Sequence, residues 1–152
     1  MIFLQAVLSK KSIAFKLFEY LDENSFTLFF SQEILDEIVD VLHRPPLRAK
    51  YSQITDEVVE IFLSRVLKKA VFVKAVPTKF KYSRDPKDEK YINLAIEIQA
   101  DYIVSRDKDL LDLMTDTSIE GKEFRQKSRP LKIVEPIEFF QILANEKLPL
   151  KP

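Results

Sequence analysis

The chain lacks cysteine and contains one histidine and one glycine among its 152 residues. Without cysteine the chain can form neither disulfides nor a thiol nucleophile. Because His43 is also its single histidine, zinc fingers and mechanisms that use two histidines are excluded. A single glycine, Gly121, excludes glycine-rich phosphate loops and dinucleotide fingerprints, which need several glycines. Carboxylates, amines and hydroxyls remain. They favour a site in which Asp and Glu oxygens hold a hard divalent cation such as Mg²⁺ or Mn²⁺.

Long apolar runs are also absent. No run approaches the roughly 18 residues that a membrane span needs. The apolar segment 2–9 is followed, not preceded, by Lys10 and Lys11, which is the wrong order for a signal peptide. We therefore expect a cytoplasmic protein without a membrane partner. The length and an apolar content of 46% predict one folded domain over residues 1–144, with a loose tail at 145–152.

Charge is balanced overall but unevenly distributed. The segment 19–60 contains ten acidic and three basic residues, whereas 65–90 contains nine basic and three acidic ones. The segment 121–132 contains five basic residues and one acidic residue. Basic segments attract polyanions such as nucleic acid, although a single lysine more often only solvates a helix face.

The periodicity of apolar residues predicts alternating helices and strands. The expected helices cover residues 12–23, 31–42, 55–69, 85 or 88 to 99, 108–114 and 137–143. The expected strands cover residues 26–30, 71–76, 101–105 and 131–134. This alternation predicts an α/β fold with a mostly parallel sheet of four to five strands and helices on both faces.

Acidic residues gather where the expected strands end and helices begin. Asp107 follows strand 101–105, and Asp88 lies in the first turn of the preceding helix. Glu37 lies two turns into the helix that follows strand 26–30. Because parallel strands end at one edge of a sheet, these acids can meet in one cleft and hold a cation. The alternative is that the two Asp residues only cap helices and that Glu37 is a solvated helix residue.

Four segments, in their order and spacing, resemble the motifs of one family. They are 31–37 (Ser-Gln-Glu-Ile-Leu-Asp-Glu), 42–45 (Leu-His-Arg-Pro), 84–88 (Arg-Asp-Pro-Lys-Asp) and 100–107 (Ala-Asp-Tyr-Ile-Val-Ser-Arg-Asp). Over nearly the whole chain the sequence resembles the PIN domain, in the subgroup that forms the toxin half of toxin–antitoxin pairs.

The resemblance implies a three-layer sandwich fold and Mg²⁺- or Mn²⁺-dependent cleavage of single-stranded RNA without a covalent intermediate. It also implies an antitoxin protein as partner and a homodimer. By motif position, Glu37, Asp88 and Asp107 match three family acids that hold the metal and orient the attacking water. Asp109 matches an auxiliary metal ligand, and Ser105 matches a small hydroxyl residue that supports the site.

The sequence departs from the family at its start. The family's first acid belongs to an Asp-Thr-Asn motif that ends a central strand, and this motif is absent here. Three explanations stay open: a misplaced start of the sequence, a rebuilt N-terminus with residues 1–6 as a shortened strand, or an inactive member. We expect residues 2–7 to supply what remains of that strand or to enter the first helix, and metal binding to be weakened.

Three functions follow from these alternatives. The first is a metal-dependent ribonuclease of the toxin type. The second is a non-catalytic PIN-like module that binds an antitoxin or RNA, which the missing Asp favours. The third, a receiver-like signalling domain with an acidic pocket, ranks below both because no lysine matches Asp107 at a neighbouring strand end.

Overall fold

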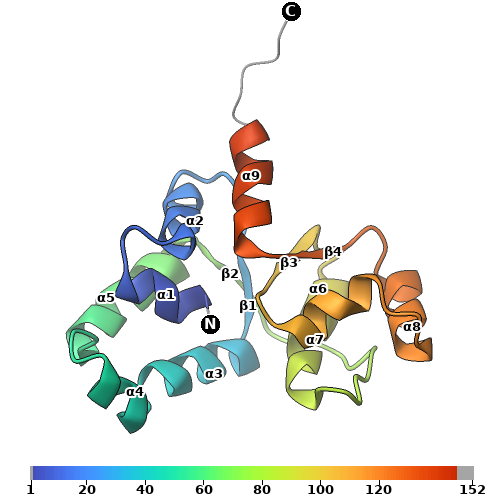
Figure 1. Cartoon of the computed structure of the whole chain (residues 1–152), viewed down its shortest axis with the longest axis horizontal. Coiled ribbons are helices and arrows are strands. Elements are labelled where there is room, and N and C mark those ends of the chain that lie inside the picture. Colours follow the sequence, from blue (N-terminus) through green and yellow to red (C-terminus); the bar gives the residue numbers. More distant parts are fainter. Residues whose placement is uncertain (1, 147–152) are drawn as a thin grey trace, which may run out of the picture. The chain divides into compact units, whose positions relative to one another are not determined.

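The computed structural model describes residues 2–146, and the chain divides into two compact units that alternate along the sequence. The first unit comprises the residues up to Leu28, Ile38–Val71 and the residues from Pro136 on. The second unit comprises Phe29–Glu37 and Phe72–Glu135. Figure 1 shows the course of the chain through both.

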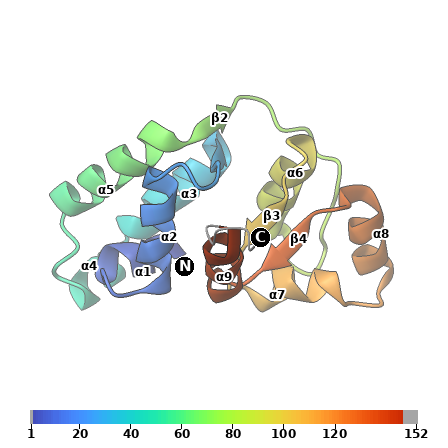
Figure 2. The ribbon, with the colours of Figure 1, turned by 90° about the horizontal axis from the view of Figure 1, so that it is seen from above.

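The first unit is helical. Its helices are α1 (Ile2–Leu8), α2 (Ile13–Asp22), the C-terminal half of α3 (Gln32–Leu42), α4 (Pro45–Lys50), α5 (Asp56–Lys69) and α9 (Pro136–Glu146). Helix α2 contacts α1, α5 and α9, and the ribbon seen from above shows α1 and α2 side by side (Figure 2).

Aromatic side chains and helix caps explain this packing. The rings of Phe3, Phe18 and Phe62 stack at tilted and edge-on angles, with centroids 5.1 to 6.3 Å apart. The hydroxyls of Ser12 and Thr55 accept backbone N–H bonds at the starts of α2 and α5. The predicted starts of both helices are therefore confirmed.

The second unit contains four short strands, the first part of α3 and three further helices. The strands are β1 (Phe29–Ser31), β2 (Val71–Val73, which begins at the unit boundary), β3 (Tyr102–Val104) and β4 (Lys132–Val134). The helices are α6 (Glu89–Glu97), α7 (Lys108–Leu111) and α8 (Ile119–Ser128), with 3₁₀ turns η1 (Pro86–Asp88) and η2 (Asp112–Met114).

The strands pair two by two. β1 pairs with β2, and β3 pairs with β4 in parallel, with Ile103 opposite Ile133. The structure is thus α/β with two small sheets, and the expected single sheet of four to five strands is not present in residues 2–146. Residues 2–8 form a separate helix, α1, so they neither supply a strand nor enter the first expected helix, which begins after Ser12 as α2.

Two further helices depart from the sequence prediction. α8 occupies a segment for which no element was expected, and α4 begins at Pro45, between the expected helices 31–42 and 55–69. Proline is favoured in the first turn of a helix because its missing N–H would have no partner there. α9 extends to Glu146, and the rest of the predicted tail, 147–152, lies outside the described residues. No helix in residues 2–146 is both long and apolar enough to cross a membrane.

Buried Asn93 holds an irregular segment against the core of the second unit. Its Oδ1 accepts the backbone N–H groups of Lys79 (2.8 Å) and Phe80 (2.9 Å), and its Nδ2 donates to the Phe80 carbonyl (3.0 Å). The side chain therefore replaces the neighbouring strand that these backbone groups lack. Phe80 belongs to a buried apolar cluster completed by Tyr82, Ile92, Ala95, Leu110, Leu113, Phe124, Leu131 and Ile133.

We expect Asn93→Ala to lower the free energy of unfolding by about 3 kcal/mol, because buried backbone groups lose their partners. Chemical denaturation monitored by circular dichroism measures the change. Asn145→Ala is the matched control, since Asn145 is exposed on α9. An equal loss in both variants would contradict the structural role of Asn93.

Candidate metal centre

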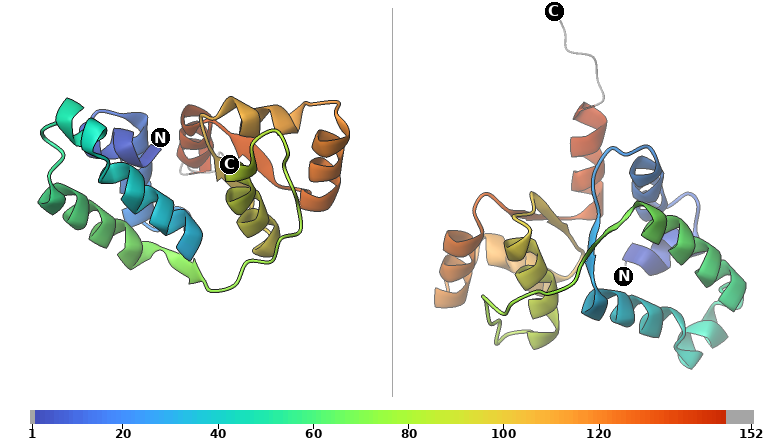
Figure 3. Two further views of the ribbon diagram at one scale, coloured as in Figure 1. Left: turned by 90° about the horizontal axis from the view of Figure 1, so that it is seen from below. Right: turned by 180° about the vertical axis from the view of Figure 1, so that it is seen from behind.

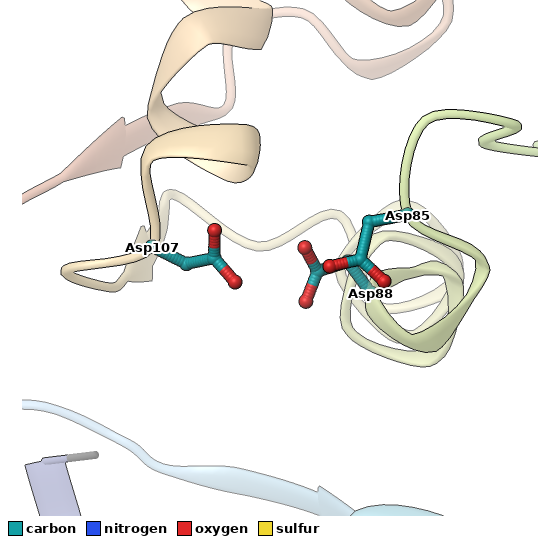
Figure 4. A group of neighbouring side chains, drawn as sticks. All are labelled: Asp85, Asp88 and Asp107. Carbon is teal, nitrogen blue, oxygen red and sulfur yellow. The ribbon is translucent and has the colours of Figure 1, made fainter.

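Three carboxylates of the second unit converge. Asp85, Asp88 and Asp107 each place one oxygen within 4.8 Å of the others. Figure 4 shows Asp107 facing Asp85 and Asp88 from the opposite side. Asp88 is only 6% exposed, whereas Asp107 is exposed. Like charges this close repel one another, so the arrangement favours either a shared proton or a bound cation.

Asp107 is placed by the end of β3. The strand ladder continues one residue beyond β3, because the Ser105 N–H donates to the Val134 carbonyl (3.0 Å). The Ser105 hydroxyl then accepts the Asp107 N–H (3.0 Å). Asp107 in turn accepts the N–H of Asp109 (2.9 Å) and caps α7. Asp107 therefore does cap α7, but the cap uses only its Oδ1, and its Oδ2 can still bind a cation.

Asp85 and Asp88 are placed by the turn η1. Asp85 accepts the N–H of Lys87 (3.1 Å) and opens the turn before Pro86. Residues three apart in a 3₁₀ helix lie on the same side, which brings Asp88 beside Asp85. Asp88 stands immediately before α6 yet makes no side-chain cap bond. Its Oδ2 is buried without a hydrogen-bond partner, so the predicted alternative of a simple cap does not describe Asp88.

The electrostatics of Asp88 follow from this placement. Burial, and then the nearby charge of Asp107, raise the pKa of Asp88 from 3.8 to about 7. Asp85 and Asp109 add to the shift, and Lys90 opposes it. A buried carboxylate that resists ionisation, with an oxygen that lacks a partner, is suited to bind a cation.

Asp109 does not join the cluster. Its carboxylate forms an ion pair with Arg84 (2.7 Å), whose guanidinium also reaches Asp112 (2.9 Å). The Tyr82 hydroxyl donates to the Asp109 carbonyl (2.6 Å), and burial raises the pKa of Tyr82 to about 12. These contacts join the segment before η1 to α7. Asp109 thus acts here as a structural anion.

Glu37 is also held away from the cluster. It accepts a hydrogen bond from the Tyr91 hydroxyl (2.7 Å) and pairs with the Lys90 ammonium (3.0 Å). Burial, and then the bond to Glu37, raise the pKa of Tyr91. Lys90 is only 12% exposed, so this pair is more strongly coupled than a surface ion pair.

The structure therefore brings together two of the four predicted metal ligands, Asp88 and Asp107, and supports Asp107 through Ser105. It adds Asp85, which the sequence places in the same acidic segment, 84–89, but which was not among the predicted ligands. The available signal was the spacing of Asp85 and Asp88, three residues apart across a proline.

The donor set fits a hard cation. All three groups are carboxylates, which Mg²⁺ and Mn²⁺ prefer over nitrogen or sulfur ligands. The free buried oxygen of Asp88 supplies a specific position for one bond.

Residues 1–109 match the sequence profile of the PIN domain. The chain belongs to the PIN-domain family. This is a nuclease family, and the match includes all three clustered acids together with Glu37. The chain is also 30% identical over 140 residues to the uncharacterized protein MJ1680 of Methanocaldococcus jannaschii, an alignment that covers 92% of this chain and 85% of that protein. No solved structure matches the chain significantly.

The raised pKa of Asp88 predicts how stability changes with pH without metal. The folded protein holds this proton more tightly than the unfolded chain does. The contribution of this proton to the stability of the folded protein is therefore complete below pH 3.8 and is lost as the pH rises to about 7. Between about pH 5.5 and about pH 8 the loss is ~2 kcal/mol, at about 1.4 kcal/mol per pH unit.

Asp88→Asn should remove this pH dependence, because an amide has no proton to lose. The variant is therefore expected to be more stable than the wild type at about pH 8 in EDTA. Thermal unfolding at both pH values measures the difference. Asp101→Asn, an exposed acid that precedes β3, should change neither value. Parallel pH profiles for wild type and Asp88→Asn would contradict the assignment.

Proposed function

We propose that this PIN-domain protein is an Mg²⁺- or Mn²⁺-dependent endoribonuclease acting on single-stranded RNA. The observation that carries the proposal is the cluster of Asp85, Asp88 and Asp107, with its buried unpartnered oxygen. We further propose, from the resemblance to toxins of toxin–antitoxin pairs, that it is such a toxin, acts in the cytoplasm as a homodimer and binds an antitoxin protein.

The three Asp residues would hold the cation. When bound, the cation supplies charge stabilisation for the cleaved phosphodiester and lowers the pKa of a water. The Ser105 hydroxyl orients Asp107 by accepting the backbone N–H of Asp107, and the η1 turn fixes Asp85 relative to Asp88. Asp109 lies outside the cluster, and Arg84 neutralises its charge, so Asp85, Asp88 and Asp107 are the acids left to attract a cation.

Asp88→Asn and Asp107→Asn should each reduce Mn²⁺-dependent cleavage of a fluorescent single-stranded RNA by at least about 100-fold, because each removes a ligand charge. Isothermal titration should show Mn²⁺ binding lost in parallel. Asp101→Asn is the control, since this acid lies at the other end of β3. Full cleavage by the double variant Asp88→Asn/Asp107→Asn would overturn the site.

The second candidate is a PIN-like module without catalysis. The engagement of Glu37 by Tyr91 and Lys90 favours it, because both contacts fall on Oε2 and offset the negative charge that this acid could offer to a metal. This candidate expects no metal-dependent cleavage by the wild type, together with retained binding of an antitoxin or RNA. The cleavage assay separates the two.

On the nuclease proposal Glu37 is a positioning residue that keeps Lys90 beside Asp88. Glu37→Gln should lower cleavage by about tenfold while leaving the Mn²⁺ dissociation constant within about threefold of wild type. Glu33→Gln, an exposed acid on the same helix, is the control. Loss of Mn²⁺ binding in Glu37→Gln would instead make Glu37 a direct ligand.

A further inference from the structure

Helix α8 carries a row of cationic side chains on one face. Lys122 and Arg125 are three residues apart, and Arg129, the C-cap residue, follows Arg125 by four, so these cations lie on one side of the helix, with Gln126 next to Arg125. These four residues line an open hollow of about 410 Å³. Like charges at this spacing destabilise a helix, so the row is not explained by the stability of α8.

A second hollow continues this surface. Its volume is about 770 Å³, and Arg129 lines it together with Lys79 and Lys127. Its other wall is formed by Ala95 and Ile96 near the C-terminal end of α6 and by Gln99 and Ala100 just after it, and α8 contacts α6 (Figure 3). Among the described residues, 2–146, none that lines either hollow is acidic. Because Arg129 belongs to both, we call Lys79, Lys122, Arg125, Lys127 and Arg129 the basic surface.

Much of its charge is not compensated. Lys79 pairs with Glu97 (2.9 Å) and Lys127 pairs with Glu123 (2.7 Å). By contrast, Lys122 and Arg129 form no ion pair within residues 2–146.

Arg125 is half-buried and is fixed in place by backbone carbonyls, close enough to the Asp116 carboxylate to interact with its charge. Its guanidinium donates to the carbonyls of Leu113 (2.7 Å) and Asp116 (2.8 Å). Gly121 permits this close packing, since a Cβ there would lie 2.7 Å from the Asp116 carbonyl oxygen and 3.3 Å from the guanidinium. The positive charge of Arg125 is therefore held on the surface with little freedom to lose on binding.

We infer that the basic surface binds the sugar–phosphate backbone of single-stranded RNA outside the Asp cluster. The inference rests on the proposed function and extends it to the part of the RNA that lies away from the cleaved bond. A cluster of carboxylates repels phosphates, so affinity for RNA requires positive charge elsewhere.

The placement within the second unit agrees with this role. Asp88 stands at the N-terminal end of α6, and the larger hollow lies at its C-terminal end. A helix of nine residues rises about 14 Å, so only an oligonucleotide can reach from one to the other. α8 lies beyond residue 109, where the match to the PIN domain ends, whereas Lys79 and α6 lie within it, so the surface combines residues from both parts of the chain.

The test measures binding separately from cleavage. Fluorescence anisotropy of a fluorescein-labelled single-stranded RNA in EDTA compares the wild type with Lys122→Gln/Arg129→Gln. Two lost phosphate contacts should weaken binding about tenfold or more at low salt and reduce the slope of log K against log salt by about 1.4, at about 0.7 per contact. Lys10→Gln/Lys11→Gln removes two exposed lysines elsewhere and should bind as the wild type does.

Equal binding by the wild type and the α8 variant would overturn the inference, as would an equal loss in the Lys10/Lys11 control. Binding to phosphatidylserine vesicles but not to RNA would overturn it as well, in favour of a membrane surface. Asp88→Asn/Asp107→Asn should retain RNA binding in EDTA. Failure of the nuclease proposal would therefore leave this binding unchanged, and the two failures can be distinguished.

Discussion

The repulsion among three carboxylates is the constraint on which the second unit depends. Asp85 and Asp107 are stabilised by backbone N–H groups, whereas Asp88 is buried with a free oxygen. Arg84 takes up the charge of Asp109, and Lys90 takes up that of Glu37. The surrounding cations therefore neutralise the neighbours of the cluster but not the cluster itself. Among these three carboxylates a divalent cation would be stabilised more strongly than a singly charged lysine or arginine side chain.

Local signals predicted most of the elements. Ser12 and Thr55 cap helices that begin where expected, and all four expected strands exist in shortened form. The pairing of strands could not be predicted in the same way, because it depends on contacts between distant segments. α8 escaped prediction since its buried residues are Gly121, Phe124 and Ser128, so a largely charged sequence hides its periodicity.

In the site, too, local signals were sufficient for some residues, and others depend on contacts between distant segments. Strand ends and helix starts were sufficient to place Asp88 and Asp107, because parallel strands present their carboxyl ends together. The role of Glu37 could not be read from its motif, since it depends on Tyr91, which is 54 residues away. Asp85 was not selected as a ligand, because an acid before a proline fits a helix start equally well. Family motifs thus identified the acids, whereas packing decides which oxygens remain free.

The alternation of the two units along the chain has a consequence for biosynthesis. When the ribosome has added Glu135, the second unit has all its residues, including the Asp cluster and the basic surface. The first unit still lacks α9, whose Phe139 packs edge-on against Phe26 and whose Phe140 lies against Tyr20 of α2. Helix α2 is therefore synthesised well before α9, against which it packs. The part of its apolar face that α9 covers stays exposed until residues 136–146 have been added.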